Sequence, residues 1–152
     1  MSPQIQFYHL TATPIERALP KLIEKAYGAG HRILLVEGSP ERLEMFNQLL
    51  WTYHPGSFLP HGSLKEGLPE EQPVLLAETP DNRNGANILL TTDGTVPSDA
   101  NEYARILDVF DGNDAAAVEK ARTRWKNYQD GGYPLSYLRQ TEAGGWEEKA
   151  VA

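Results

Sequence analysis

The residue types best suited to chemistry lie together in residues 115–129 (AAAVEKARTRWKNYQ). Four of these residues are Lys or Arg and one is Glu, so the stretch carries a net charge of +3, whereas the whole 152-residue chain carries −7. On a helix, Arg122 and Lys126 stand one turn apart beside Trp125, and Val118 lies on the same apolar stripe as Trp125. Cations next to an aromatic ring can hold a carboxylate and an apolar side chain together. The spacing therefore predicts a docking site for an acidic peptide that ends in a hydrophobic residue.

The same stretch has two other interpretations. The first is an ordinary amphipathic helix with a solvated basic rim, in which Lys120 and Arg124 form the flank opposite Arg122 and Lys126. The second is direct binding of DNA through the positive helix. The acidity of the whole chain argues against the second interpretation, because neutralising phosphates requires an excess of Lys and Arg.

Aromatic side chains also gather between Trp51 and His61 (WTYHPGSFLPH), a segment rich in Pro and Gly. Trp51, Tyr53, Phe58 and Leu59 form a dense apolar set for a loop of this composition. Two interpretations stay open. These side chains hold the loop against the core, or they form an exposed anchor for another protein.

The chain shows no pattern of catalytic or metal-binding residues. It has no cysteine, and its four histidines (His9, His31, His54 and His61) lack the HxxxH and HExxH spacings of metal sites. We expect His9 to be a packed or edge residue of a strand. No GxSxG nucleophile elbow is present. The sequence therefore predicts neither a metal site nor an enzyme.

A small nucleotide-dependent enzyme is the alternative that an α/β fold suggests. Phosphate-binding loops follow a strand and precede a helix, where backbone N–H groups face the anion. Residues 11–14 (TATP) contain no glycine, and residues 37–40 (EGSP) begin with Glu37, which would repel a phosphate. No GxxxxGK[ST] motif occurs. We therefore expect no cofactor.

Alternating strands and helices must position these residues. Apolar and β-branched runs predict strands, and an apolar period of 3.6 residues predicts helices. The expected strands are residues 5–10, 31–37, 74–76, 88–92 and 105–110, and the expected helices are residues 15–27, 40–51 and 115–129. Residues 52–73 are expected to form long surface loops. The pattern predicts a three-layer α/β/α fold with a mostly parallel central sheet, resembling nucleotide-binding folds.

Length and composition are typical of one soluble domain, which we place at residues 1–139, followed by a flexible C-terminal tail at residues 140–152. No secretory signal and no apolar run long enough to span a membrane are visible. The absence of cysteine fits a reducing compartment. We therefore expect a cytoplasmic protein that does not bind a membrane.

Four segments, in their order and spacing, resemble one known family. They are FYHL at residues 7–10, GHRILLVEGSPERLEMFNQLLW at 30–51, SFLPHG at 57–62 and ARTRWKNYQDGGYPL at 121–135. Over about residues 5–138 the chain is similar to the chi subunit of the bacterial DNA polymerase III holoenzyme, a part of the clamp-loader assembly. The resemblance implies a non-enzymatic α/β protein that binds the acidic, phenylalanine-terminated C-terminal tail of single-stranded-DNA-binding protein. It also implies binding to the psi subunit, which connects chi to the clamp loader, so that DNA is contacted only indirectly.

The resemblance also implies roles for particular residues. Arg122, Trp125 and Lys126 match the peptide-binding helix of the family, and Trp125 stands where many members have Tyr. Val118 occupies a position that is basic in well-known members. The residues expected to contact psi surround Phe58 and are Trp51, Phe58, Leu59, Pro60 and His61.

Overall fold

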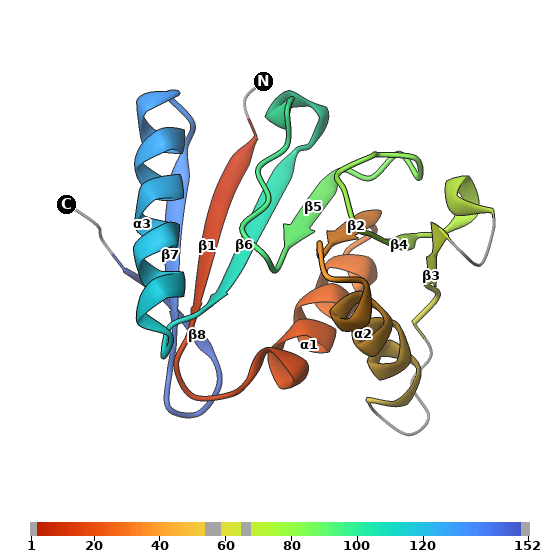
Figure 1. Ribbon diagram of the computed structural model, residues 1–152, viewed down its shortest axis with the longest axis horizontal. Helices are drawn as coiled ribbons and strands as arrows, with labels where there is room; N and C mark the ends of the chain where they lie inside the picture. The colour runs from red at the N-terminus through yellow and green to blue at the C-terminus, as the bar shows by residue number, and fades with distance from the viewer. Residues whose placement is uncertain (1–2, 54–58, 65–67, 150–152) are drawn as a thin grey trace.

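A sheet runs through the centre of the molecule and is covered on both faces (Figure 1). The computed structural model describes residues 3–53, 59–64 and 68–149. Within these residues eight strands lie in the order β3-β4-β2-β5-β6-β1-β7-β8, and each neighbouring pair is parallel except β7 with β8. The strands are β1 (Gln4–Leu10), β2 (Ile33–Val36), β3 (Gly62–Ser63), β4 (Val74–Ala77), β5 (Ile88–Thr91), β6 (Arg105–Asp111), β7 (Leu135–Gln140) and β8 (Trp146–Lys149).

Helices form the two outer layers. The helices α1 (Ile15–Gly28) and α2 (Pro40–Thr52) pack on one face of the sheet, and α3 (Ala115–Asp130) packs on the other (Figure 1). This arrangement confirms the predicted three-layer α/β/α fold with a mostly parallel sheet. Two 3-10 helices, η2 (Pro69–Glu71) and η3 (Ala100–Glu102), lie in the connections. In the described ranges, no helix combines the length and the apolar character that crossing a bilayer requires.

Two hydrophobic clusters, one on each face of the sheet, join the three layers. Phe46 of α2 packs with Leu35 of β2 in the first cluster, and Tyr128 of α3 packs with Phe7 of β1 in the second. All residues of β2 (ILLV), β4 (VLLA) and β5 (ILLT) are buried. Strands that are apolar throughout are typical of a parallel sheet with helices or loops on both faces. The unbroken apolar runs are therefore explained by burial on both sides.

The sequence pattern does not predict the last two strands. β7 pairs in parallel with β1, and β8 folds back antiparallel on β7. The rings of Trp146 and Tyr8 meet edge to face with their centroids 4.9 Å apart, which anchors β8 on the α1 side of the sheet. The sheet thus continues past residue 139, and part of the segment expected as a tail is a strand. The expected domain boundary does not coincide with the end of the sheet.

Candidate functional site

Capping at both ends defines the length of α3. The Oδ1 atom of Asp114 accepts hydrogen bonds from the backbone N–H groups of Ala116 (3.0 Å) and Ala117 (3.3 Å) at the start of the helix. The helix ends at Asp130 with Gly131 as its C-cap, and Gly132 follows with φ +80°, a conformation that favours glycine. The helix lies across β6 and β7, the strands that it connects.

The structure brings the four predicted peptide-binding residues together on α3. Val118 and Trp125 are half-buried and pack on the hydrophobic cluster beneath the helix, whereas Arg122 and Lys126 are exposed. Among the described residues, neither Arg122 nor Lys126 has an ion-pair partner. This part of the helix therefore presents two available cations beside apolar surface.

Aromatic contacts hold the indole of Trp125 in place. Its ring centroid lies 5.3 Å from that of Phe7 on β1 and 5.9 Å from that of Tyr137 on β7, both in edge-on geometry. Phe7 is almost completely buried, so it supports the indole from below. An aromatic ring fixed in this way can receive an apolar side chain at little entropic cost, because it has already lost its rotational freedom.

Arg124 differs from the other cations of α3 because it is paired inside the protein. Its Nε lies 2.6 Å from Oδ2 of Asp108 on β6, and its Nη2 lies 2.9 Å from Oδ1. Burial raises the pKa of Asp108, and the hydrogen bonds and charge of Arg124 act in the opposite direction. The sequence interpretation that placed Arg124 on a solvated flank is therefore wrong. The available signal was Asp108 itself, a carboxylate inside the apolar strand RILDVFD.

The sequence pattern did not predict that His9 of β1 lies beside Tyr137 and Arg139 of β7. His9 packs among aromatic rings, as predicted, and its Nδ1 is hydrogen-bonded to the hydroxyl of Tyr137. The Cα of Arg139 lies in register with that of His9. Burial lowers the pKa of His9, as do the positive charges of Arg139 and Arg122, while the carboxylate of Asp111 acts in the opposite direction. The available signal was the run LSYLRQ shortly after the Gly131-Gly132 turn.

The second predicted surface is divided between exposed and buried side chains. Trp51, near the end of α2, is 45 % exposed, whereas Leu59 and His61 are buried. The His61 ring lies 4.3 Å from the Trp51 ring, with Nδ1 2.6 Å from the Leu59 carbonyl oxygen and Nε2 3.0 Å from a carbonyl oxygen of α2. Pro60 is half-buried, and Phe58 lies outside the described residues. Leu59 and His61 therefore hold the loop on α2, as the first interpretation expects, whereas the anchor for another protein stays a prediction, with Trp51 as its exposed apolar side chain.

The loop between β1 and α1 donates its backbone N–H groups to a side chain of the protein itself. The N–H groups of Thr11 (3.2 Å), Ala12 (2.9 Å) and Thr13 (2.9 Å) all point to Oε1 of Gln140, at the end of β7. In return, Nε2 of Gln140 donates to Oγ1 of Thr13 at 2.7 Å. A phosphate bound at this helix N-terminus would need the same donors. Gln140 occupies the place that a phosphate would take.

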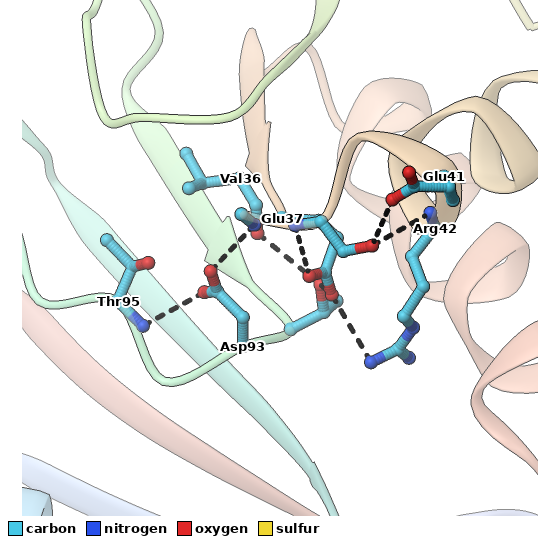
Figure 2. Close-up of polar contacts among 9 residues, drawn as sticks. Val36, Glu37, Glu41, Arg42, Asp93 and Thr95 are labelled. Atoms are coloured by element: carbon cyan, nitrogen blue, oxygen red, sulfur yellow. Dashed lines mark hydrogen bonds and ion pairs between the residues drawn. The ribbon is translucent and has the colours of Figure 1, made fainter.

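Carboxylates accept the corresponding N–H groups between β2 and α2 (Figure 2). The N–H of Gly38 donates to Oδ2 of Asp93 at 2.7 Å, and the N–H of Ser39 donates to Oε2 of Glu37 at 3.0 Å. Glu37 also forms an ion pair with Arg42 at 3.4 Å. Two carboxylates at this helix N-terminus repel phosphate, so neither loop supports the nucleotide-dependent alternative.

A cleft of about 780 Å³ opens at the carboxyl ends of the strands, where ligands bind in many α/β folds. Both signs of charge line it, and two of its cations, Arg42 and Arg124, are already in ion pairs. Among the residues that the structure describes, no three His, Asp or Glu side chains are grouped to hold a metal ion. The cleft therefore shows no assembled catalytic or metal centre in the described residues.

Comparisons with known proteins agree with the resemblance seen in the sequence. The family model described as "DNA polymerase III chi subunit, HolC" matches residues 2–136. A probable DNA polymerase III subunit chi of Rickettsia prowazekii is 31 % identical over 106 residues, which cover 70 % of this chain and 61 % of that protein. The DNA polymerase III subunit chi of Haemophilus influenzae is 25 % identical over 141 residues, which cover 90 % of this chain and 96 % of that protein. The match thus spans about six-tenths of the Rickettsia protein and nearly all of the Haemophilus one.

Proposed function

The chain belongs to the DNA polymerase III chi subunit family, and from this premise we propose that it is a non-enzymatic adaptor in DNA replication. In this role it binds the acidic C-terminal tail of single-stranded-DNA-binding protein. It connects that protein, through the psi subunit, to the clamp loader. It contacts DNA only indirectly, and it acts in the cytoplasm.

The observation that carries the proposal is the exposed cationic and aromatic face of α3. The tail ends in an apolar side chain, which lies on the half-buried surface of Val118 and Trp125. Carboxylates of the tail are bound by Arg122 and Lys126, which have no ion-pair partner among the described residues. Charge-assisted hydrogen bonds of this kind are short and directional, and salt weakens them because the cations are exposed.

The two proposed binding surfaces lie on opposite layers of the molecule. The peptide-binding residues lie on α3, whereas Trp51 belongs to α2, which packs on the other face of the sheet (Figure 1). We propose that psi contacts Trp51 and the segment of residues 58–61, in which Leu59 and His61 are buried and hold the loop in place, while Pro60 is half-buried and Phe58 lies outside the described residues. An adaptor must hold both partners at once, and surfaces separated by a sheet allow this without competition.

The nucleotide-dependent alternative receives no support from the loops that would have to bind phosphate. The N–H donors after β1 are bonded to Gln140, and those after β2 are bonded to Asp93 and Glu37. A thermal-shift screen with nucleotides checks this conclusion directly. A reproducible stabilisation by a nucleotide would revive the enzyme hypothesis.

A titration with a tail peptide tests the main proposal. A labelled acidic peptide ending in phenylalanine is added to the wild type and to the double variant Arg122→Ala/Lys126→Ala, at low and at moderate salt. We expect each lost cation to weaken binding by about 1 kcal/mol at low salt. The matched control is Lys21→Ala/Lys25→Ala, which removes the same charge from exposed positions of α1, on the other face of the sheet. Failure of the wild type to bind, or equal binding by both double variants, contradicts the proposed site.

The psi contact needs a separate experiment. Trp51→Ala should weaken capture of psi in a pull-down and leave the affinity for the tail peptide unchanged, because the two surfaces do not overlap. Loss of peptide affinity in this variant would contradict the separation of the sites.

A further inference from the structure

Arg139 of β7 lies on the same face of the sheet as α3. Its Cα is in register with His9 of β1, and Tyr137, two residues earlier, is in register with Phe7. Side chains in register on neighbouring strands point to the same face of the sheet. Because Phe7 packs against Trp125, that face is the one that α3 covers. Arg139 is therefore beside the proposed peptide site, on a different element.

Arg122 of α3 and Arg139 of β7 both act electrostatically on the imidazole of His9. Both positive charges lower the pKa of His9, after the larger effect of burial. The same two charges also act on the hydroxyl of Tyr137, which is hydrogen-bonded to His9. Asp111 of β6 acts on His9 with the opposite sign. The two arginines thus belong to neighbouring elements of one face of the molecule, where Trp125 packs on Phe7 and Tyr137.

Neither arginine is neutralised within the part of the chain that the structure describes. The Cα of Glu147 is in register with that of Arg139 in the β7–β8 pairing, but the Glu147 carboxylate is bonded to Nζ of Lys149 at 3.1 Å. The other arginine of this helix, Arg124, is paired with Asp108 and carries no free charge. Two unpaired guanidinium groups on neighbouring elements of one face offer planar donors to an anion, so the pair is suited to a carboxylate.

We propose that Arg122 and Arg139 together bind the terminal carboxylate of the acidic peptide, so that β7 forms the second side of the binding site. This inference rests on the proposed function. The side chain of the last peptide residue then lies on Trp125 and Tyr137, whose ring centroids are 5.9 Å apart. Lys126, one turn further along α3, binds the acidic side chains that precede the last residue. Guanidinium groups suit this role because their planar donors match the two oxygens of a carboxylate.

A cycle of protein and peptide changes tests the placement of the carboxylate. The same Phe-terminated acidic peptide, with a free or an amidated C-terminus, is titrated into the wild type, into Arg139→Gln and into Arg105→Gln. The last variant is the matched control, because Arg105 is exposed and lies at the opposite end of the sheet. We expect Arg139→Gln to weaken binding of the free-acid peptide about five- to tenfold at low salt and to change the amidated peptide by about twofold or less. Arg105→Gln should change neither affinity by more than about twofold.

The outcomes separate this inference from the proposed function. If the wild type binds the peptide and Arg139→Gln binds it equally well, the role of Arg139 is overturned and the adaptor function stands. The same holds if Arg139→Gln weakens binding of the free-acid and the amidated peptide equally. A wild type that binds neither peptide overturns both. Partial recovery of the affinity for the free-acid peptide in Arg139→Lys supports a charge contact, because Lys keeps the charge but not the planar fork.

The imidazole signals of His9 give a second, local measurement by nuclear magnetic resonance. The charged groups that act on His9 are Arg139 on β7, Arg122 on α3 and Asp111 on β6. A carboxylate bound between the two arginines offsets their charges, so the pKa of His9 should rise when the free-acid peptide binds. The amidated peptide should cause a smaller rise. Equal shifts with both peptides would overturn the proposal.

Discussion

Replacing Arg124 with Ala should destabilise the fold while leaving the groups proposed to bind the peptide in place. Arg124 makes two hydrogen bonds to Asp108, at 2.6 and 2.9 Å, and the two side chains are 13 % and 2 % exposed. Without its partner, the carboxylate of Asp108 stays buried and unpaired. Removing one member of a buried ion pair costs about 3–5 kcal/mol. The same change at an exposed pair costs about 1 kcal/mol or less, so the size of the loss reports on burial.

The pH dependence of this loss has a definite sign. Burial raises the pKa of Asp108 above its ordinary value, and Arg124 opposes the rise. Without Arg124 the pKa of Asp108 rises further, and the folded variant takes up a proton more readily than the unfolded chain. The stability difference from the wild type is therefore largest at neutral pH and shrinks as the pH falls through the raised pKa of Asp108.

Urea denaturation of wild type and variant, at neutral pH and at about pH 5, measures both effects as free energies of unfolding, and thermal melting at neutral pH gives the matching change in Tm. For a chain of this size each kcal/mol lowers Tm by about 2–4 °C, so Arg124→Ala should melt about 6–20 °C lower. The double variant Arg124→Ala/Asp108→Asn should recover part of the loss, because it removes the unpaired charge. Below its melting range, Arg124→Ala should bind the tail peptide with nearly the wild-type affinity.

Two results would refute this reasoning. A loss below about 1 kcal/mol would show that Asp108 is hydrated in solution, as for an exposed pair. A variant that is fully folded but fails to bind the peptide would show that Arg124 belongs to the binding surface.

Three further predictions concern the neighbouring elements. Gln140→Ala leaves the N–H groups of residues 11–13 without their acceptor and should lower the free energy of unfolding by about 1–3 kcal/mol in urea, whereas Gln140→Glu, which keeps a side-chain oxygen, should lose less. Glu147→Gln removes a negative charge from the residue that pairs with Arg139 across the β7–β8 register, and it should tighten binding of the free-acid peptide about twofold at low salt. Weaker binding in the titration would contradict the proposal that β7 forms the second side of the site. The pKa of His9 is lowered from 6.5 in the folded protein, so just below that pH the unfolded chain binds more protons than the folded protein does. The free energy of unfolding therefore decreases as the pH is lowered. His9→Gln should therefore lose less stability than the wild type between about pH 7.5 and pH 5. Parallel plots of unfolding free energy against pH for the two proteins would contradict the lowered pKa of His9.

The fold was predictable where a segment carries its own pattern. The run ILLV of β2 and the amphipathic period of α1 reflect burial that local sequence encodes. β7 and β8 mix polar and apolar residues, and whether they form strands depends on contacts with residues far along the chain, such as the packing of Trp146 on Tyr8. Propensity in a short window does not contain such contacts, which is why these strands escaped prediction.

The candidate site was predictable for the same reason only in part. The helical spacing of Arg122, Trp125 and Lys126 is a local property, so the sequence indicates it directly. Whether a cation is available to a ligand depends on tertiary pairing. Arg124 and Arg139 show the two outcomes, since one is paired with Asp108 beneath the helix and the other is not paired in the described residues.

The strand order also determines when the face proposed to bind the peptide can form during synthesis. β1 is made first, yet it lies between β6 and β7, whose paired residues follow about 100 and 130 positions later. At ordinary rates of translation, β1 waits about 5–25 s for these neighbours. The strands β2, β3, β4 and β5 pair among themselves and are complete by residue 91, so this half of the sheet can assemble earlier. A ribosome that stalls before residue 105 leaves Phe7, the later support of Trp125, without its neighbouring strands.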